Sequence, residues 1–289
     1  MAADIVDLTG RTAVVTGASS GIGVHLARGL AAHGANVVVA ARRLERLEAL
    51  AAELGESGTQ ALAVRCDVTD HEQVEGLLDA ACERFGRVDV MVNDAGTAGD
   101  GGPVPEKTPP ELFEQTVRVN LFGVFFGCQA AGRRMLADGR GGSIVNLASF
   151  LGLAGQQDYP PAYQASKAAV VNLTRALAVS WADRGVRVNA IAPGWFPTEM
   201  TEGFFSMPRF MESVLQMEPM GRIGRPEELV APLLFLASDA SSYVTGHTLA
   251  VDGGMTASTG AARHTAAYLD EFAAVVPAGL GERVGTAPR

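Results

Sequence analysis

A glycine-rich turn between a predicted strand and a predicted helix constrains the fold of this chain more than any other feature. The strand is the apolar run Thr12–Thr16, and the helix has apolar residues at Ile22, Leu26 and Leu30. Glycines let a backbone approach a pyrophosphate closely, and a helix start offers free N–H groups and a positive dipole end. A tight turn without a ligand is the alternative, because the spacing is G-x-x-x-G-x-G rather than the commoner G-x-G-x-x-G. The residues predicted to hold a dinucleotide here are Gly17, Ser19, Ser20, Gly21, Ile22 and Gly23.

The rest of the chain repeats this alternation of strand and helix without a linker. Short apolar runs predict further strands at residues 37–40, 61–65, 88–92, 143–147, 186–191 and 248–251. Helical spacing predicts helices at residues 43–54, 70–85, 110–136, 161–183 and 226–237. This pattern indicates one α/β domain over residues 1–256, with a Rossmann-type, doubly wound, seven-stranded parallel sheet and helices on both faces.

Composition narrows the class of protein and its compartment. The net charge of −9 argues against nucleic acid as a partner. No uncharged apolar run reaches the roughly 18 residues of a membrane span, and the N-terminus lacks the pattern of a signal peptide. Cys66, Cys82 and Cys128 have neither metal-ligand spacing nor a pairing pattern. We therefore expect a cytoplasmic protein with free thiols, no metal site and no membrane partner.

The end of the second predicted strand bears on the choice of cofactor. In dinucleotide-binding folds this point faces the adenosine ribose, and an acidic residue there repels a 2′-phosphate. This chain has Ala41 followed by Arg42 and Arg43, and a guanidinium matches a phosphate in charge and geometry. We therefore expect NADP(H) to be favoured over NAD(H), with Arg42 the stronger phosphate ligand. The alternative for Arg43 is a solvated side chain in the first turn of the next helix.

Other candidate residues follow the predicted strands, at the sheet edge where such folds bind ligands. They are Asp67, Val68, Asn93, Ala95, Gly96, Ser149, Pro193 and Gly194. For Asp67, a role as a turn or helix-capping residue is the alternative. Asn120 lies in an otherwise apolar helical run, where a buried amide needs partners. The Asn120 side chain either makes a hydrogen bond that packs two helices together or is a functional amide.

Tyr163 and Lys167 are the strongest catalytic candidates. Four residues apart on a predicted helix, they lie one turn apart on the same face. Tyrosine alone is a poor acid or base at neutral pH, because its reference pKa is about 10, and a nearby ammonium lowers that pKa. A surface pair without function is the alternative, but the glycine turn and the strand-end residues favour the catalytic interpretation.

Two segments differ from the rest of the chain. Residues 195–220, called the lid below, are rich in aromatic residues and methionine and follow a predicted strand end, so we expect an apolar wall over the crevice. An ordinary packing or subunit-contact segment is the alternative. In the C-terminal extension, residues 257–289, apolar spacing predicts an amphipathic helix at 261–276, and we expect a disordered end at 277–289.

Together these motifs resemble the classical short-chain dehydrogenases/reductases over residues 8–254. The resemblance implies that Tyr163 is the general acid/base and that Ser149 polarises a carbonyl. It also implies that Lys167 lowers the tyrosine pKa and binds the nicotinamide ribose, and that Asn120 positions a water in a proton relay. The implied reaction is hydride transfer between the nicotinamide and a ketone or secondary alcohol, and the apolar lid indicates that this substrate has an apolar part.

The resemblance also implies how the cofactor is held. Asp67 would meet the adenine, while Asn93 and Gly96 would line the cofactor. The residues implied to flank the nicotinamide and its phosphates are Ile191, Pro193, Gly194 and Thr198. One departure is visible: the family usually has Asn-Asn-Ala-Gly, and here Asp94 takes the second position. An aspartate accepts hydrogen bonds but cannot donate an amide proton.

Alternatives to this predicted function concern the substrate and the class of protein. Residues 191–200 resemble gluconate 5-dehydrogenase-like members and 3-oxoacyl-carrier-protein reductases, whereas the lid points to a larger hydrophobic ketone. An NAD(H)-dependent sugar-acid or polyol dehydrogenase is the alternative within the family. A non-catalytic dinucleotide-binding sensor or scaffold is the alternative from another class. The resemblance further implies a homotetramer in which helices 110–136 and 161–183 pair between subunits.

Overall fold

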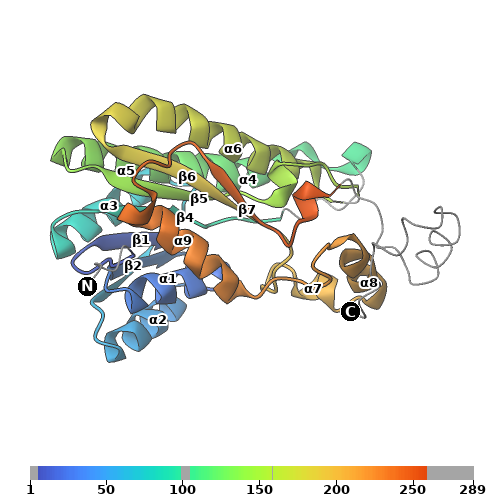
Figure 1. Ribbon diagram of the computed structural model, residues 1–289, viewed down its shortest axis with the longest axis horizontal. Coiled ribbons are helices and arrows are strands. Elements are labelled where there is room, and N and C mark those ends of the chain that lie inside the picture. The colour runs from blue at the N-terminus through green and yellow to red at the C-terminus, as the bar shows by residue number, and fades with distance from the viewer. Residues whose placement is uncertain (1–5, 99–104, 158, 259–289) are drawn as a thin grey trace, which may run out of the picture.

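The computed structural model describes residues 6–98, 105–157 and 159–258 (Figure 1). The strands are β1 (Thr12–Thr16), β2 (Asn36–Ala41), β3 (Ala61–Arg65), β4 (Val90–Asn93), β5 (Gly142–Leu147), β6 (Val186–Pro193) and β7 (Thr248–Val251). They form one seven-stranded sheet in the order β3-β2-β1-β4-β5-β6-β7, and every neighbouring pair is parallel. The strand order reverses between β1 and β4, which opens a crevice at their carboxyl ends. The predicted doubly wound sheet is confirmed.

Helices cover both faces of this sheet (Figure 1). The α-helices of the described residues are α1 (Ile22–Ala32), α2 (Leu44–Glu56), α3 (His71–Phe85), α4 (Pro110–Val117), α5 (Gly123–Asp138), α6 (Pro161–Trp181), α7 (Glu202–Phe205), α8 (Pro208–Met217) and α9 (Val230–Ala237). Helices α1, α2 and α9 pack on one face, and α3, α5 and α6 pack on the other. The parallel strands are therefore buried from both sides, as their continuous apolar runs require.

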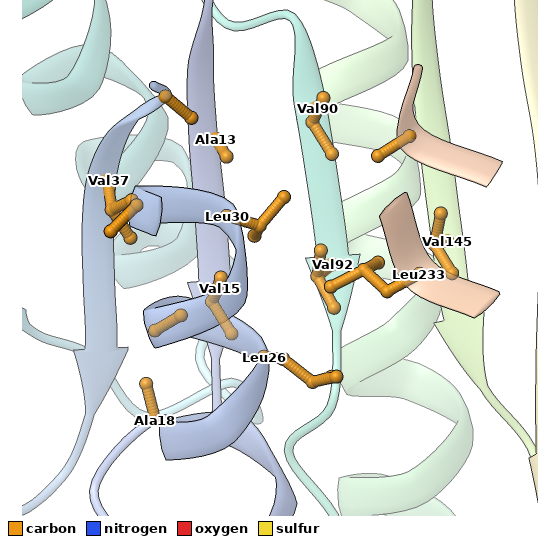
Figure 2. Packing of buried hydrophobic residues seen from close by; sticks show 14 of the residues in the cluster. Ala13, Val15, Ala18, Leu26, Leu30, Val37, Val90, Val92, Val145 and Leu233 are labelled. Atoms are coloured by element: carbon orange, nitrogen blue, oxygen red, sulfur yellow. The ribbon is translucent and has the colours of Figure 1, made fainter. Parts of the chain in front are cut away.

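Alternating side chains of each strand divide the core into two layers. Ala13 and Val15 of β1 belong to the cluster under α1, while Val14 belongs to the cluster under α3 and α5. Figure 2 shows the first layer, where Leu26 and Leu30 of α1 lie over the strands. All five side chains are fully buried, so the glycine turn between β1 and α1 is anchored at both ends.

The predicted helix 110–136 is interrupted. Helix α4 is followed by a π-helical stretch, Arg118–Phe122, before α5 begins. The π-helical stretch contains Asn120, and such stretches are frequent at functional sites. At the start of α5, a Cβ on Gly123 would lie 2.7 Å from Val68, so the glycine allows close packing on the loop after β3.

The lid forms the short helices α7 and α8 beyond the carboxyl ends of the strands (Figure 1). Within the described ranges, no helix is both long enough and apolar enough to cross a membrane. The three cysteines are free, as predicted. Except for residues 257 and 258, the predicted C-terminal extension lies outside the described residues, and so does its amphipathic helix.

Candidate active site

A cavity of about 470 Å³ lies at the carboxyl edge of the sheet, between the glycine turn and the lid. It is lined by most of the residues predicted from the sequence. These are Gly17, Ser19, Ser20, Gly21, Ile22, Arg42, Arg43, Asp67, Val68, Ala95, Gly96, Ser149, Tyr163, Lys167, Pro193, Gly194 and Thr198. Tertiary packing thus gathers segments from six strand ends around one space of the size that ligand sites usually have.

Four predicted residues do not line this cavity: Gly23, Asn93, Asn120 and Ile191. All four are buried. The side chain of Asn93 is buried and donates to Asn146 Oδ1 at 2.9 Å, so it joins β4 to β5 inside the core. The amide of Asn93 faces the core, because this residue ends a central strand that is covered on both faces. Its predicted place beside the cofactor stays a prediction.

The glycine turn has the geometry of a phosphate cradle. Gly17 and Gly21 have positive φ values of 77° and 58°, which favour glycine. A Cβ on Gly17 would lie 2.7 Å from the nitrogen of Ala95. The N-cap residue of α1, Gly21, makes no side-chain capping hydrogen bond, and Gly21 and Ile22 at the helix start line the cavity. These features fit a dinucleotide pyrophosphate.

The end of β2 places two guanidinium groups at one end of the cavity. Arg43 donates to the hydroxyls of Ser19 at 3.1 Å and Ser20 at 2.7 Å, and to the carboxylate of Glu199 at 2.9 Å. Arg42 is exposed and lines the same cavity, and its side chain has no hydrogen bond or ion pair with another residue of the described ranges. Arg43 is therefore more than a solvated side chain, whereas no described residue competes with a ligand for the Arg42 guanidinium.

Asp67 is a turn residue that also lines the cavity, and its contact with an adenine stays a prediction. It lines the cavity, and its Oδ1 accepts hydrogen bonds from the backbone N–H of Thr69 at 3.0 Å and from its hydroxyl at 2.8 Å. These bonds close a local turn after β3. The turn holds the carboxylate at the strand edge, where the remaining oxygen can meet a ligand.

The other end of the cavity gathers Ser149, Tyr163 and Lys167. The Tyr163 hydroxyl is hydrogen-bonded to the Ser149 side chain. Lys167 Nζ donates to the Leu147 carbonyl at 2.7 Å and lies 5.8 Å from the centre of the Tyr163 ring. Helix α6 thus presents both residues one turn apart toward the end of β5, as the four-residue spacing predicts.

Burial governs how these groups titrate. It raises the pKa of Tyr163, which the hydrogen bond with Ser149 opposes. It lowers the pKa of Lys167 to about 8, which the nearby charge of Asp94 opposes. Tyr163 therefore holds its proton at neutral pH, while Lys167 is close to titration. The lowering of the Tyr163 pKa by Lys167 stays a prediction.

Asp94, the departure from the family pattern, is a partly buried residue whose carboxyl interacts with the catalytic residues. Burial raises its pKa to about 7, while the charge of Lys167 and a hydrogen bond from the Gly23 N–H lower it. A Cβ on Gly23 would lie 2.7 Å from Asp94 Oδ2, so Gly23 makes room for this carboxyl instead of lining the cavity. Asp94 itself does line the cavity.

Asn120 fastens the loop after β4. Its Oδ1 accepts from the Thr97 N–H at 2.8 Å, and its Nδ2 donates to the Thr97 carbonyl at 2.9 Å and to Ser166 Oγ at 3.1 Å. Both amide protons are therefore used. The bond to Ser166 joins the π-helical stretch to α6, so Asn120 does make the helix-packing hydrogen bond considered as one alternative.

Aromatic rings connect the lid to the catalytic end. The Trp195 ring lies 5.5 Å from Phe150 and 5.4 Å from Phe210 of α8. The Tyr159 ring lies 5.9 Å from Trp195 and 5.3 Å from Tyr163. Phe150 and Tyr159 were not predicted as site residues. Phe150 directly follows Ser149 in the sequence, and Tyr159 lies just before the start of α6, the helix that carries Tyr163.

Comparison with known proteins agrees with this geometry. A protein-family model described as enoyl-(acyl carrier protein) reductase matches residues 17–256. Galactitol 2-dehydrogenase (L-tagatose-forming) of Cereibacter sphaeroides is 45% identical over 250 residues, which are 86% of this chain and 96% of that protein. The chain belongs to the short-chain dehydrogenase/reductase family.

Other relatives bear on the variety within this family. 3beta-hydroxysteroid dehydrogenase 1 of Eggerthella lenta is 43% identical over 251 residues, which are 86% of this chain and 95% of that protein. A solved gluconate 5-dehydrogenase from Burkholderia cenocepacia J2315, in complex with NADP and tartrate, is 37% identical with a TM-score of 0.85, covering 90% of this chain and 100% of that chain. The predicted family is confirmed. This short-chain dehydrogenase/reductase is an oxidoreductase that acts on alcohols or ketones.

Proposed function

We propose that this protein is an NADP(H)-dependent oxidoreductase that interconverts a ketone and a secondary alcohol, with Tyr163 as the general acid/base. The observation that carries the proposal is one cavity with Arg42 and Arg43 at one end and Ser149, Tyr163 and Lys167 at the other. A dinucleotide lying along this cavity brings its phosphorylated ribose to the arginines and its nicotinamide to the hydroxyl groups.

The catalytic residues handle the substrate oxygen and its proton. In the direction of reduction, Ser149 donates a hydrogen bond to the carbonyl oxygen, and Tyr163 transfers its proton to the developing alkoxide. Lys167, held at the Leu147 carbonyl, returns a proton toward the tyrosine, since a pKa of about 8 lets it do so near neutral pH. The bound nicotinamide supplies or accepts the hydride.

Asn120 belongs to the same proton path in this proposal. Its Oδ1 accepts one hydrogen bond, from Thr97, and a carbonyl oxygen has room for a second. A Cβ on Gly96 would lie 3.4 Å from Asn120 Oδ1 and 3.6 Å from Lys167 Nζ, so a relay water beside Gly96 would reach both groups.

The end of β2 supports the phosphorylated cofactor. Ala41 offers no carboxylate to repel a 2′-phosphate, and two arginines follow it. The gluconate 5-dehydrogenase of Burkholderia cenocepacia binds NADP, which agrees with this choice. Asp67 lies at the next strand edge, where the proposal places the adenine.

The substrate is proposed from the wall that faces Tyr163. Trp195, Tyr159 and Phe150 give that wall an apolar, aromatic surface, which favours a ketone with an apolar part. The named relatives act on substrates as unlike as galactitol and a 3beta-hydroxysteroid. A polyol or sugar acid is therefore the second candidate, favoured by the relatives rather than by the wall.

The test measures binding and turnover with NADPH and NADH side by side, against a panel of cyclic ketones, ketoesters, polyols and sugar acids. We expect NADPH to bind more tightly and Arg42→Ala to remove that preference. Tighter binding of NADH would contradict the cofactor assignment. Tight cofactor binding without turnover on any of the panel would favour the non-catalytic sensor or scaffold, which the presence of Ser149, Tyr163 and Lys167 in one cavity argues against.

We also propose a cytoplasmic homotetramer. Exposed apolar side chains on α4, α5 and α6 support pairing of these helices between subunits; they include Phe113, Phe125 and Val179. The free cysteines agree with a reducing compartment. Light scattering on the purified protein should give four times the mass of the chain, and a monomer would contradict the proposal.

A further inference from the structure

A bridge of charged side chains crosses the cavity at its arginine end. Glu199, in the loop after β6, forms an ion pair with Arg43 at 2.9 Å and another with Arg46 of α2. Arg43 in turn donates to Ser19 and Ser20 of the glycine turn. One carboxylate thus joins the lid, the β2–α2 junction and the glycine turn, which are far apart in the sequence.

Glu199 is a permanent anion at this point. Hydrogen bonds from Arg46 and Arg43 lower the pKa of its carboxyl to about 2, so it is ionised throughout the working pH range. Its side chain is half exposed and lines the cavity together with Arg42 and Arg43. The carboxylate therefore holds a guanidinium that a phosphate group entering the cavity would also attract.

We propose that Glu199 sets the discrimination between NADP(H) and NAD(H), because its carboxylate competes with the 2′-phosphate for Arg43. The inference rests on the proposed NADP(H) site. Arg42, which has no side-chain partner in the described ranges, meets the phosphate first. Arg43 then exchanges the carboxylate for the phosphate, while Glu199 keeps Arg46. NAD(H) brings no anion to this point and leaves the bridge intact.

Charge accounts for the sign of the effect. The net charge of this group is +2, because three guanidinium groups face one carboxylate. The guanidinium groups are those of Arg42, Arg43 and Arg46, and the carboxylate is that of Glu199. Neutralising the carboxylate raises the positive charge available to a phosphate and removes one repulsion. The groups are exposed, so the gain is modest and shrinks at high salt.

The test compares Glu199→Gln with Glu53→Gln. Glu53 pairs with Arg28 in an ion pair of similar exposure, 46% and 49% against 44% and 50% for Arg43 and Glu199. It therefore controls for the loss of a surface ion pair as such. Dissociation constants of NADPH and NADH are measured for the wild type and both variants by protein fluorescence and by calorimetry, at low and at high salt.

We expect Glu199→Gln to tighten NADPH binding by about three- to fivefold, with little change for NADH and a smaller gain at high salt. Glu53→Gln should change neither constant. Equal tightening of both cofactors, no change, or weaker NADPH binding in Glu199→Gln would overturn the proposal. A wild type that prefers NADH would contradict the proposed cofactor, yet the ratio of variant to wild-type constants would still decide the role of Glu199.

Discussion

The strand ends and the lid line the same cavity, but their side chains are fixed in different ways. At the strand ends, functional groups are tied by hydrogen bonds to buried partners, as Lys167 is to a carbonyl of β5. In the aromatic part of the lid, the rings pack on one another, as Trp195 does on Phe210, and within α7 and α8 only Val214 is buried. Directional bonds hold one geometry, whereas ring contacts tolerate repacking.

This difference separates two kinds of consequence. Changes at the strand ends should impair the reaction with every substrate, because they alter the groups that handle the proton. Changes to the aromatic side chains of α7 and α8 should alter which substrate is used and leave cofactor binding intact, since loops that surround a rigid scaffold carry selectivity. Four variants test this contrast, from the largest expected effect to the smallest.

Tyr163→Phe should lower kcat by about 10²- to 10⁴-fold for every substrate, because the proton donor is lost. Binding of NADPH should hardly change. Tyr159→Phe is the matched control, since it removes a hydroxyl from the ring 5.3 Å away and should keep most of the turnover. Steady-state kinetics with two unlike substrates make the comparison. Near-normal turnover of Tyr163→Phe would show that another group is the acid.

Phe210→Ala should lower kcat/KM for an apolar ketone by about tenfold, because it removes a ring that packs on Trp195. A small polar substrate should be much less affected, and the dissociation constant of NADPH should stay the same. Phe235→Ala, which truncates an exposed ring on α9, serves as the control. Equal losses for both substrates would mean that the lid supports the chemistry rather than selectivity.

Asp94→Asn should change the pH dependence of both stability and rate. The fold raises the pKa of Asp94 from 3.8 to about 7, so its stabilising contribution is complete below 3.8 and is lost as the pH rises through about 7. The difference in free energy of unfolding between the variant and the wild type should therefore be more favourable to the variant at about pH 8 than at about pH 5. It should also lower the pKa of Lys167, because the charge that opposes burial is gone.

Thermal unfolding and the pH profile of kcat/KM across the same range test Asp94→Asn. We expect the alkaline limb of the kcat/KM profile to move to lower pH in the variant, so that kcat/KM on that limb falls a few-fold below that of the wild type. Identical profiles for the variant and the wild type would exclude coupling between Asp94 and Lys167.

Glu218→Gln makes the corresponding change at the far end of the lid. Burial and then the charge of Asp252 raise the pKa of Glu218 to about 7, and its Oε2 has no hydrogen-bond partner among the described residues. Stability from this group is likewise complete below 4.5 and lost as the pH rises through about 7. The variant should raise Tm above neutral pH by about 2–4 °C.

The pH profile of kcat/KM distinguishes the two carboxyl groups. It should shift in Asp94→Asn and stay unchanged in Glu218→Gln, because only Asp94 interacts with the catalytic residues. A shifted profile in Glu218→Gln would show that the lid and the catalytic end are coupled through Asp252, which packs on Gly194.

Local patterns were enough to predict the sheet, the glycine turn and the pair Tyr163 and Lys167. Each depends on the spacing of neighbouring residues, since strand and helix periods and the one-turn contact on a helix are short-range properties. Parallel strands then bring their carboxyl ends to one edge, so residues after the strands could be expected to meet there. The sequence by itself therefore determined the fold and most of the cavity wall.

Tertiary packing decided which way individual side chains face. Asn93 follows the expected strand, yet its amide turns into the core because β4 is central and covered on both faces. Arg43 meets Glu199 across 156 positions of sequence, a contact that no local pattern carries. The titration of Asp94 likewise depends on burial, which follows from the whole packed structure rather than from neighbouring residues.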